Sequence, residues 1–350
     1  MPIHRITDAP DSLSHPIINY RLKGEADKSM SSSFFRGKNC NFNPYQDDFK
    51  QGRFLQKFLM HGWLPDQKII GQNTKVTAFG SCFAEHITKH LANIGYCTTA
   101  ATYPDIYISL MAEGMVNVHA ICQQFEWALE NITPPESLWH GFKCEQFGYD
   151  ESIRLRTRQA FLETDLFIIT LGLSEIWYDE VTGGIFWRAV PLNVYDETRH
   201  KFRVCSHAET KEKIEHIYRL IRKHNPASKI LFTLSPVPLA ATFRPISCIT
   251  ANSCSKAILR AALDEFLREK QEEVNRKLFY FPSFEIVTEL FFSRYTQDNR
   301  HPHPEIIQFI MHLFESTYCD STVTLESVEQ LFADLRRKNA EQTPNLANGS

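Results

Sequence analysis

Two uninterrupted apolar runs place the tightest constraint on how this chain can fold. Residues 165–171 (DLFIITL) end at Gly172, and Lys229–Leu234 (KILFTL) ends at a Ser-Pro pair. Continuous apolar runs are typical of parallel strands that are buried on both faces of a sheet. A helical pattern over residues 208–224 separates the two runs, so the order strand, helix, strand predicts a right-handed parallel crossover.

Strand and helix patterns continue on both sides of this unit. Residues 75–80 (KVTAFG) predict a short strand that leads into an amphipathic helix over 83–94, and a helix over 254–277 precedes the short strand Leu278–Phe281. This alternation predicts an α/β fold of the three-layer, flavodoxin-like kind, with a mostly parallel sheet between two layers of helices. Further helices are expected over residues 47–62, 304–317 and 325–338.

Three segments depart from the alternation. Residues 1–45 are polar and predict an extended N-terminal arm, and residues 339–350 predict a disordered tail after a main domain over 46–338. Residues 174–206 carry several aromatic side chains and a glycine pair, which predicts an inserted hairpin or loop region at the carboxyl edge of the sheet. Ligands bind at that edge in open α/β sheets, so the insert is a candidate pocket wall. Core packing is the competing interpretation of its aromatic residues.

Composition narrows the class of protein. Hydrophobic residues make up 43% and charged residues 23%, and the formal net charge is −3, so nothing favours nucleic acid as a partner. The first ten residues lack the apolar stretch of a signal peptide, and no apolar run is long enough to span a membrane. The nine cysteines include no Cys-x-x-Cys pair, which argues against a disulfide framework and a structural zinc site. We expect a cytoplasmic protein without metal or cofactor; its oligomeric state stays open.

The first motif with chemical meaning is Gly80-Ser81-Cys82, at the predicted turn from strand to helix. The N-terminus of a helix offers backbone N–H groups and the positive end of the helix dipole. Such surroundings lower a thiol pKa and stabilise a developing oxyanion. The competing interpretation is a tight turn of small residues with a buried thiol, since free cysteine is often buried.

The second motif is Asp298-Asn299-Arg300-His301, in a polar loop before a helix. Asp and His three residues apart can hydrogen-bond within one turn, so the carboxylate would orient the imidazole as in a catalytic triad. His303 is an alternative base, and a merely local role for Asp298 in the loop is the competing interpretation. A metal hydrolase is disfavoured, because no third ligand stands at suitable spacing from His301 and His303.

The third motif is Gly172-Leu173-Ser174-Glu175, where the second strand ends. Glycine permits close approach of the backbone, and the Ser174 hydroxyl could donate to an oxyanion. Alternatively, Gly172 only ends the strand and Glu175 caps a helix. Because the carboxyl ends of parallel strands meet at one edge, the three motifs together predict a site there.

The sequence at these motifs resembles the GSCFA family. Residues 79–84 (FGSCFA) carry the motif that names the family, and residues 170–177, 234–238 and 298–302 are similar to its later blocks, over about 75–313. The family is grouped with the SGNH hydrolases, and the resemblance implies their fold. It also implies that Cys82 stands for the nucleophilic serine, His301 for the base and Asp298 for its orienting acid.

The resemblance extends to the rest of the site, with two departures. In the Gly-Asp-Ser motif of the SGNH hydrolases, the Gly matches Gly80 and the Asp matches Ser81. The Gly of their Gly-x-Asn-Asp block, which contributes to the oxyanion hole, matches Gly172. Gly95 is a candidate for the glycine of their second block. The nucleophile position holds Cys instead of Ser, although a slip of one residue would place Ser81 there. Ser174, followed by Glu175, replaces the oxyanion asparagine, and the loss of one such donor typically costs about 10²–10³ in rate.

These features predict an acyltransferase or esterase that works through an acyl-enzyme on Cys82. A thioester such as acyl-CoA is compatible as the donor substrate, and the hydroxyl or amine of a small molecule or glycan is compatible as the acceptor. Two alternatives stay open: a serine esterase that uses Ser81, and an inactive SGNH-like module that binds a glycan or a protein. The missing asparagine favours the inactive module, and the intact Asp-x-x-His pair opposes it.

Overall fold

The computed structural model describes residues 18–20, 28–30, 41–111, 113–133, 139–140 and 146–342. The chain divides into two units, Met1–Gln51 and Gly52–Ser350. In the first unit, β1 (Ile18–Tyr20) pairs antiparallel with β2 (Lys28–Met30), and η1 (Asp48–Lys50) forms one turn of 3₁₀ helix. Most of the arm expected over 1–45 and the end of the expected tail, 343–350, lie outside the described residues.

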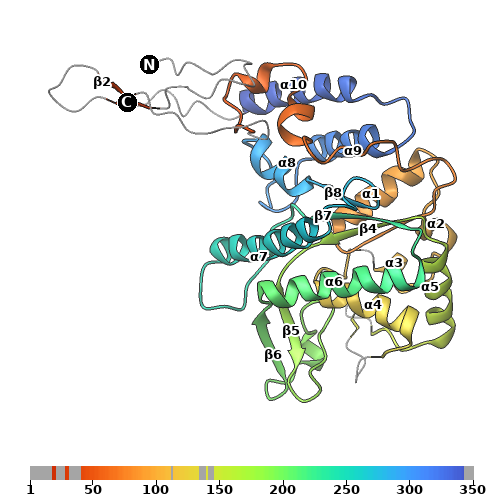
Figure 1. The fold of residues 1–350 in the computed structure, drawn as a ribbon. Coiled ribbons are helices and arrows are strands. Elements are labelled where there is room, and N and C mark those ends of the chain that lie inside the picture. The colour runs from red at the N-terminus through yellow and green to blue at the C-terminus, as the bar shows by residue number, and fades with distance from the viewer. Residues whose placement is uncertain are drawn as a thin grey trace. The chain divides into compact units, whose positions relative to one another are not determined.

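The central sheet of the second unit has four strands, all parallel, in the order β3-β4-β7-β8 (Figure 1). They are β3 (Val76–Phe79), β4 (Leu166–Leu171), β7 (Lys229–Leu234) and β8 (Leu278–Phe281). The two apolar runs are thus the two central strands, and both are covered by helices. The predicted three-layer α/β fold is confirmed.

Helices cover both faces of this sheet (Figure 1). One layer holds α1 (Cys82–Asn93), α8 (Ser283–Leu290), α9 (Pro304–Tyr318) and α10 (Leu325–Gln342). The other layer holds α4 (Val118–Glu130), α5 (Glu151–Glu163), α6 (His207–His224) and α7 (Cys248–Glu269), and the short helices α2 (Thr99–Thr102) and α3 (Tyr107–Leu110) lie between β3 and α4 in the chain. Among the described residues, no helix is both long and apolar enough to cross a membrane.

Some helix boundaries were predicted wrongly. The helix expected over 47–62 is replaced by η1 and by the π-helix η2 (Leu55–Leu59), because Gly52 and the positive φ of Arg53 (66°) interrupt the pattern. Helix α7 begins and ends several residues earlier than the expected 254–277, and α10 continues to Gln342, past the expected end at 338. The four helices between α1 and β4, α2 to α5, were not predicted.

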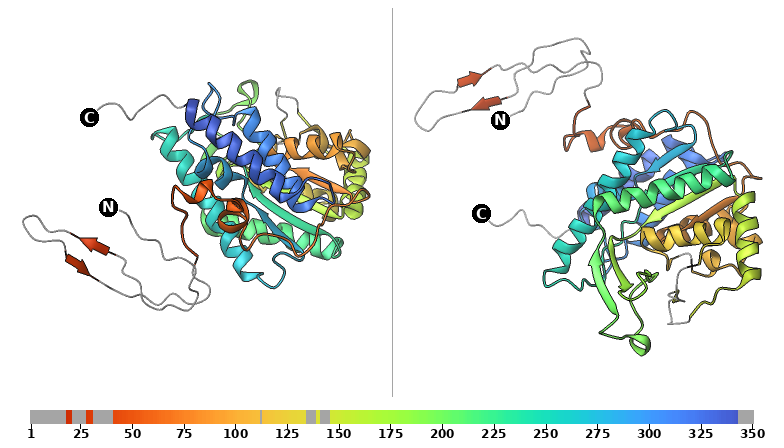
Figure 2. Two further views of the ribbon diagram at one scale, coloured as in Figure 1. Left: turned by 90° about the horizontal axis from the view of Figure 1, so that it is seen from above. Right: turned by 60° about the horizontal axis from the view of Figure 1, so that its bottom comes forward.

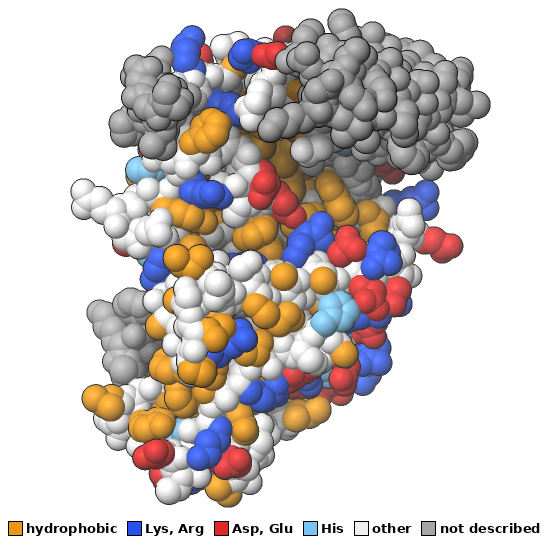
Figure 3. All heavy atoms as spheres, turned by 90° about the vertical axis from the view of Figure 1, so that its left-hand side faces the viewer, with side chains coloured by type: hydrophobic (Ala, Val, Ile, Leu, Met, Phe, Trp, Pro, Cys, Tyr) orange, Lys and Arg blue, Asp and Glu red, His pale blue; other side chains and the backbone are white. Residues whose placement is uncertain are grey.

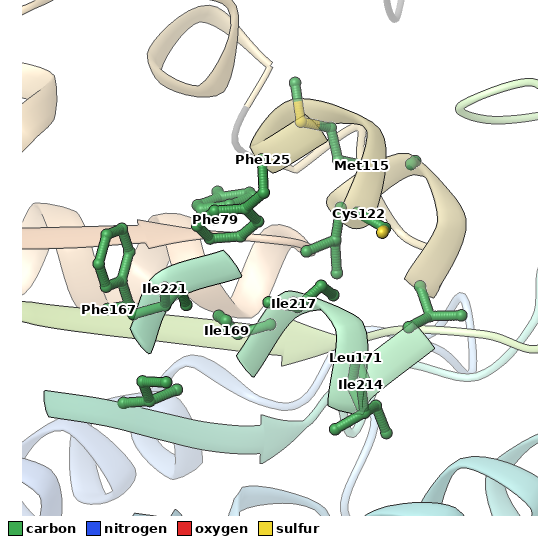
Figure 4. Close-up of a cluster of buried hydrophobic side chains, with 14 of the residues drawn as sticks. Phe79, Met115, Cys122, Phe125, Phe167, Ile169, Leu171, Ile214, Ile217 and Ile221 are labelled. Carbon is green, nitrogen blue, oxygen red and sulfur yellow. The ribbon is translucent and has the colours of Figure 1, made fainter. Parts of the chain in front are cut away.

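The packing of the core explains why apolar and polar residues do not alternate along the central strands. On β4, Phe167, Ile169 and Leu171 pack against the layer of α4 and α6, where Ile214 and Ile217 face them (Figure 4). The intervening residues of the strand are equally buried on the opposite face. Since side chains alternate between the two faces of a strand, burial on both faces demands an apolar residue at nearly every position.

The contact between α4 and α6 carries three histidine–glutamate pairs. His119 lies 2.9 Å from Glu209, and the two other pairs, His216–Glu126 and His224–Glu130, are 3.0 and 2.5 Å apart between nitrogen and oxygen. His119 is the most buried of the three histidines. Its burial lowers its pKa to about 4, against the smaller opposing effect of Glu209.

This lowered pKa predicts a loss of stability on mild acidification. The unfolded chain binds a proton at His119 below about pH 6.5, whereas the folded chain does so only near pH 4, so the contribution present above pH 6.5 is lost between those values. The free energy of unfolding, measured with urea at pH 7.5 and 5.0, is expected to fall by about 2 kcal/mol less in His119→Gln than in the wild type. His224→Gln, on the more exposed pair, is the control; identical pH dependence of His119→Gln and wild type would contradict the prediction.

Candidate active site

A sharp turn between β3 and α1 presents Cys82. Gly80 has a φ of +133°, and a Cβ atom there would come within 3.0 Å of three backbone atoms of Thr170, so only glycine fits. Ser81 is the N-cap of α1: its Oγ accepts the Phe83 N–H at 3.2 Å, and the residue is 3% exposed. Cys82 follows as the first helical residue and is partly exposed. The turn therefore buries Ser81 and leaves Cys82 partly exposed, although both residues line the cavity described next.

A second turn builds the Asp298–His301 pair. Oδ2 of Asp298 pairs with Nδ1 of His301, and Oδ1 accepts the backbone N–H groups of Arg300 and His301 at 2.9 and 3.0 Å. These bonds, that of the His301 amide first, hold the pKa of Asp298 well below its usual range. An ionised carboxylate only accepts hydrogen bonds, so Nδ1 of His301 carries the hydrogen and Nε2 is left as the basic nitrogen.

Cys82 and His301 line the same cavity at the carboxyl edge of the sheet. It has a volume of about 530 Å³, and Gly172 and Ser235, directly after β4 and β7, form part of its wall. A second hollow of about 390 Å³ shares three lining residues with it: Cys82, Val237 and His301. The thiol and the imidazole thus lie where two hollows meet.

The inserted hairpin forms an aromatic wall of the larger cavity. Its strands, β5 (Glu175–Asp179) and β6 (His200–Val204), pair antiparallel and extend from the sheet (Figure 2, right). Trp177 of β5 packs against Phe202 of β6 and against Phe243, with ring centroids 5.7 and 4.8 Å apart. All three rings line the cavity, and hydrophobic side chains gather on the face that carries the hairpin and the loop before α7 (Figure 3). The expected pocket wall is therefore present.

The structure does not support the predicted oxyanion donors. Ser174 is 1% exposed and does not line the cavity; its N–H and its hydroxyl lie 2.8 and 3.2 Å from Oγ of Ser255. The N–H of Gly172 donates to the Val116 carbonyl at 2.9 Å. Glu175 does line the cavity, where it accepts a hydrogen bond from Thr242 at 3.0 Å, but it caps no helix.

Two further candidates lie away from the thiol. Gly95 follows α1 at its C-terminal end, a helix length of about 18 Å from Cys82 by the rise of 1.5 Å per residue. His303 is the N-cap residue of α9 and lines neither hollow. Cys82, His301 and Asp298 are the predicted residues that the structure brings together, with Ser81, Gly80 and Gly172 beside them.

Four charged residues at the site were not predicted: Glu113, Arg188 and Arg300, which line the cavity, and Lys256. Lys256 of α7 is 3% exposed, and its Nζ donates to the carbonyl oxygens of Gly172 and Ser235 at 2.7 and 2.8 Å. Arg300 and Glu113 line the cavity itself. Arg300 stands inside the Asp298–His301 motif and could have been considered from its position there, whereas no local pattern marks Lys256 or Glu113.

The groups around Cys82 shift the pKa of its thiol in opposite directions. Burial raises its pKa above the ordinary value, and Glu113 adds to the rise. Lys256 and then Arg300 act in the opposite direction. The net pKa is raised, so at neutral pH Cys82 is a thiol that needs a base before it can attack.

Two groups of side chains outside the cavity have the donor types of a metal site. They are His119, Cys205 and Glu209, and Cys122, Glu126 and His216, each with ligand atoms within 4.8 Å of one another. Both oxygens of Glu209 are already engaged by Arg203, at 2.6 and 2.7 Å. Neither group touches the cavity that Cys82 lines.

Comparison with known proteins gives the family. Residues 75–314 match the GSCFA family, and the chain belongs to it. No curated protein matches the chain in sequence.

Two of the solved structures that are similar to the chain in part are an acyltransferase and an esterase. One is the salicylyl-acyltransferase SsfX3 from a tetracycline biosynthetic pathway, at 9% identity and a TM-score of 0.31, over 80% of this chain and 56% of that one. The other is the acetyl xylan esterase Est2A from the rumen bacterium Butyrivibrio proteoclasticus, at 13% identity and a TM-score of 0.33, over 76% of this chain and 64% of that one. The chain thus spans less than two thirds of either protein.

Proposed function

We propose that the protein is an acyl-transfer enzyme, an acyltransferase or esterase, that forms an acyl-enzyme on Cys82. The observation that carries the proposal is the meeting of three groups at one cavity: a partly exposed thiol at a helix N-terminus, an imidazole, and an anionic carboxylate bound to that imidazole. In nucleophilic catalysis with a general base, these three groups serve as the nucleophile, the base and the group that orients the base.

In the first step, Nε2 of His301 takes the proton of the Cys82 thiol. The thiolate attacks the carbonyl carbon of an ester or thioester, forming the Cys82 S–C bond. The leaving alkoxide or thiolate takes the proton from His301, so the imidazole returns to its neutral form. Asp298 stabilises the imidazolium in between, since its own lowered pKa keeps it ionised.

The oxyanion would be held by groups other than those expected from sequence. The N–H of Cys82 has no carbonyl four residues before it within the helix, because the first N–H groups of any helix lack such partners. It lies at the positive end of the α1 dipole, and the Arg300 side chain lines the same cavity. Gly172 and Ser174 take no part, because their N–H groups are already bonded.

In the second step, His301 takes a proton from water or from an acceptor hydroxyl or amine, which attacks the acyl-Cys82 carbonyl. The S–C bond to Cys82 then breaks, and the leaving thiolate takes the proton back from His301. The two hollows that meet at Cys82 can hold the acyl group and the acceptor on separate sides. The aromatic wall of Trp177, Phe202 and Phe243 suits an apolar acyl chain or the face of a sugar ring. A small molecule or a glycan is therefore the acceptor that we propose besides water, and acyl-CoA is one compatible donor.

Intact-mass spectrometry after incubation with small acyl thioesters and activated esters tests the proposal. We expect one acyl adduct on the wild type and on Ser81→Ala, and none on Cys82→Ala. Loss of the adduct only in Ser81→Ala would replace the proposal by a serine esterase. Absence of any adduct, with donors bound without turnover, would replace it by a binding module.

The two roles of Asp298 can be separated by two substitutions. Asp298→Asn keeps an Oδ1 acceptor for the loop N–H groups but removes the charge, and we expect kcat to fall about 10- to 100-fold, less than for a buried triad because the pair is half-exposed. Asp298→Ala should lower the melting temperature as well. Steady-state kinetics and thermal unfolding of both variants measure this; an unchanged kcat in Asp298→Asn would leave Asp298 with a purely structural role.

A further inference from the structure

We propose that Glu175 is a substrate-recognition residue, whose carboxylate binds an ammonium group of the substrate in an aromatic subsite of the cavity. The subsite consists of Glu175, Trp177, Phe202 and Phe243, all of which line the cavity together with Cys82. The inference rests on the proposed function, because it names the class of substrate as an amine with neighbouring hydroxyl groups. Ligand binding tests it without any acyl transfer.

The buried carboxylate of Glu175 lacks a partner. Glu175 is 6% exposed, and its Oε1 accepts a hydrogen bond from the Thr242 hydroxyl at 3.0 Å, whereas Oε2 is buried and has no hydrogen-bond partner. Arg188 and Arg300 line the same cavity, but within the described part of the chain no basic side chain forms an ion pair with this carboxylate. Glutamate is almost never buried unless it is paired. A proton on Oε2 would lack an acceptor just as the ionised oxygen lacks a donor, so the missing partner is a group of the ligand.

The hairpin brings three aromatic rings to this carboxylate. Glu175 and Trp177 stand two positions apart on β5 and therefore share one face of the hairpin, and Phe202 of β6 is the direct partner of Trp177. The bond from Thr242 to Glu175 brings in the next residue, Phe243, whose ring centroid lies 4.8 Å from that of Trp177 and 5.3 Å from that of Phe202. The carboxylate and the rings thus form one continuous wall, which Phe243, 55% exposed, leaves open to solvent.

An ammonium group fits both parts of this wall. It donates charge-assisted hydrogen bonds to a carboxylate and is attracted to the faces of aromatic rings. The indole Nε1 of Trp177 is also buried without a hydrogen-bond partner, and it can only donate, so an oxygen beside the ammonium group would satisfy it. An amino sugar carries an ammonium group next to hydroxyl oxygens, on a ring whose apolar face can pack on aromatic side chains.

Three methyl glycosides that differ at a single ring carbon test the proposal: those of glucosamine, glucose and N-acetylglucosamine. Their binding to the full chain is measured by isothermal titration calorimetry at about pH 6, where an alkyl amine is protonated. We expect the wild type to bind the glucosamine derivative about tenfold more tightly than the two neutral ones, and Glu175→Gln to lose this preference. Glu180→Gln removes a carboxylate from an exposed position of the same hairpin, outside the cavity, and should keep the preference.

Trp177→Leu is measured in parallel and guards against misfolding of Glu175→Gln, because it removes a ring of the subsite and should weaken binding of the glucosamine derivative. Loss of the preference in Glu175→Gln, at an unchanged circular dichroism spectrum, supports the proposal. Equal binding of the three glycosides by the wild type, tighter binding of a neutral one, or no binding at all overturns it, as does a preference that survives in folded Glu175→Gln. If the preference depends on Glu175 but no donor forms an acyl-enzyme, the proposed function fails while this inference stands.

Discussion

Cys82→Ala is expected to lower kcat by about 10⁴-fold or more for any acyl donor that labels the wild type, because removal of a covalent nucleophile abolishes the acyl-enzyme route. The fold should be unaffected, since the side chain is partly exposed at the start of α1 and has no structural hydrogen bond to another side chain. Steady-state kinetics together with the melting temperature measure both expectations.

A matched cysteine serves as the control for this substitution. Cys254 is exposed on α7 and does not line the cavity, so Cys254→Ala should leave kcat and the adduct mass unchanged. Cys82→Ser tests the chemistry further: a serine at this position should react more slowly with thioesters, because the hydroxyl is harder to ionise than the thiol. Full activity in Cys82→Ala, with activity lost in Ser81→Ala, would contradict the assignment.

Gly80→Ala is expected to have the largest effect on stability. The new Cβ would collide with the backbone of Thr170 at the end of β4, and the φ of +133° is one that residues other than glycine rarely adopt. Backbone cannot rotate away as a side chain can, so the strain and the overlap together should cost about 4 kcal/mol, a large part of the stability of an ordinary domain. Urea unfolding, or loss of soluble protein, measures the effect.

Gly95→Ala separates the steric effect from backbone strain. Gly95 also has a positive φ, +86°, but a Cβ there would meet no atom within 4 Å. Its substitution should therefore cost only the strain of the left-handed backbone, about 1–2 kcal/mol. Equal destabilisation by the two substitutions would show that Thr170 can move. It would contradict the explanation that close packing of the turn on β4 excludes a side chain at residue 80.

Most of the sheet could be predicted from local patterns. The runs at β4 and β7 are apolar throughout because both of their faces are buried, and burial of that kind is visible in the sequence itself. The helices of the segment from 97 to 163 were not predicted: the 13-residue helices α4 and α5, and the four-residue helices α2 and α3. Propensity is a weak guide for elements of four residues, which cannot form by themselves.

The candidate site likewise contains residues that local patterns predict and residues that depend on distant contacts. Cys82 and the Asp298–His301 pair could be predicted, because a strand-to-helix turn and a pair three residues apart are local in sequence. Ser174 was expected to serve the oxyanion, but it is buried and its N–H is bonded to Ser255, a residue 81 positions away that no local pattern connects with it. Lys256 could not be predicted at all: it stands within a helix whose pattern shows nothing of the two strand ends that bind it.

By itself, the sequence determined the parallel α/β sheet, the turn that exposes Cys82 and the local pairing of Asp298 with His301. These follow from side-chain periodicity, from glycine at a strained turn and from short-range hydrogen bonds, all of which act between near neighbours. Only the tertiary structure decided that the thiol and the imidazole line one cavity, that a buried lysine binds the carbonyls of Gly172 and Ser235, and that the N–H groups of Gly172 and Ser174 are already engaged. Those features depend on which distant segments come together when the strands assemble, and no local sequence pattern determines that.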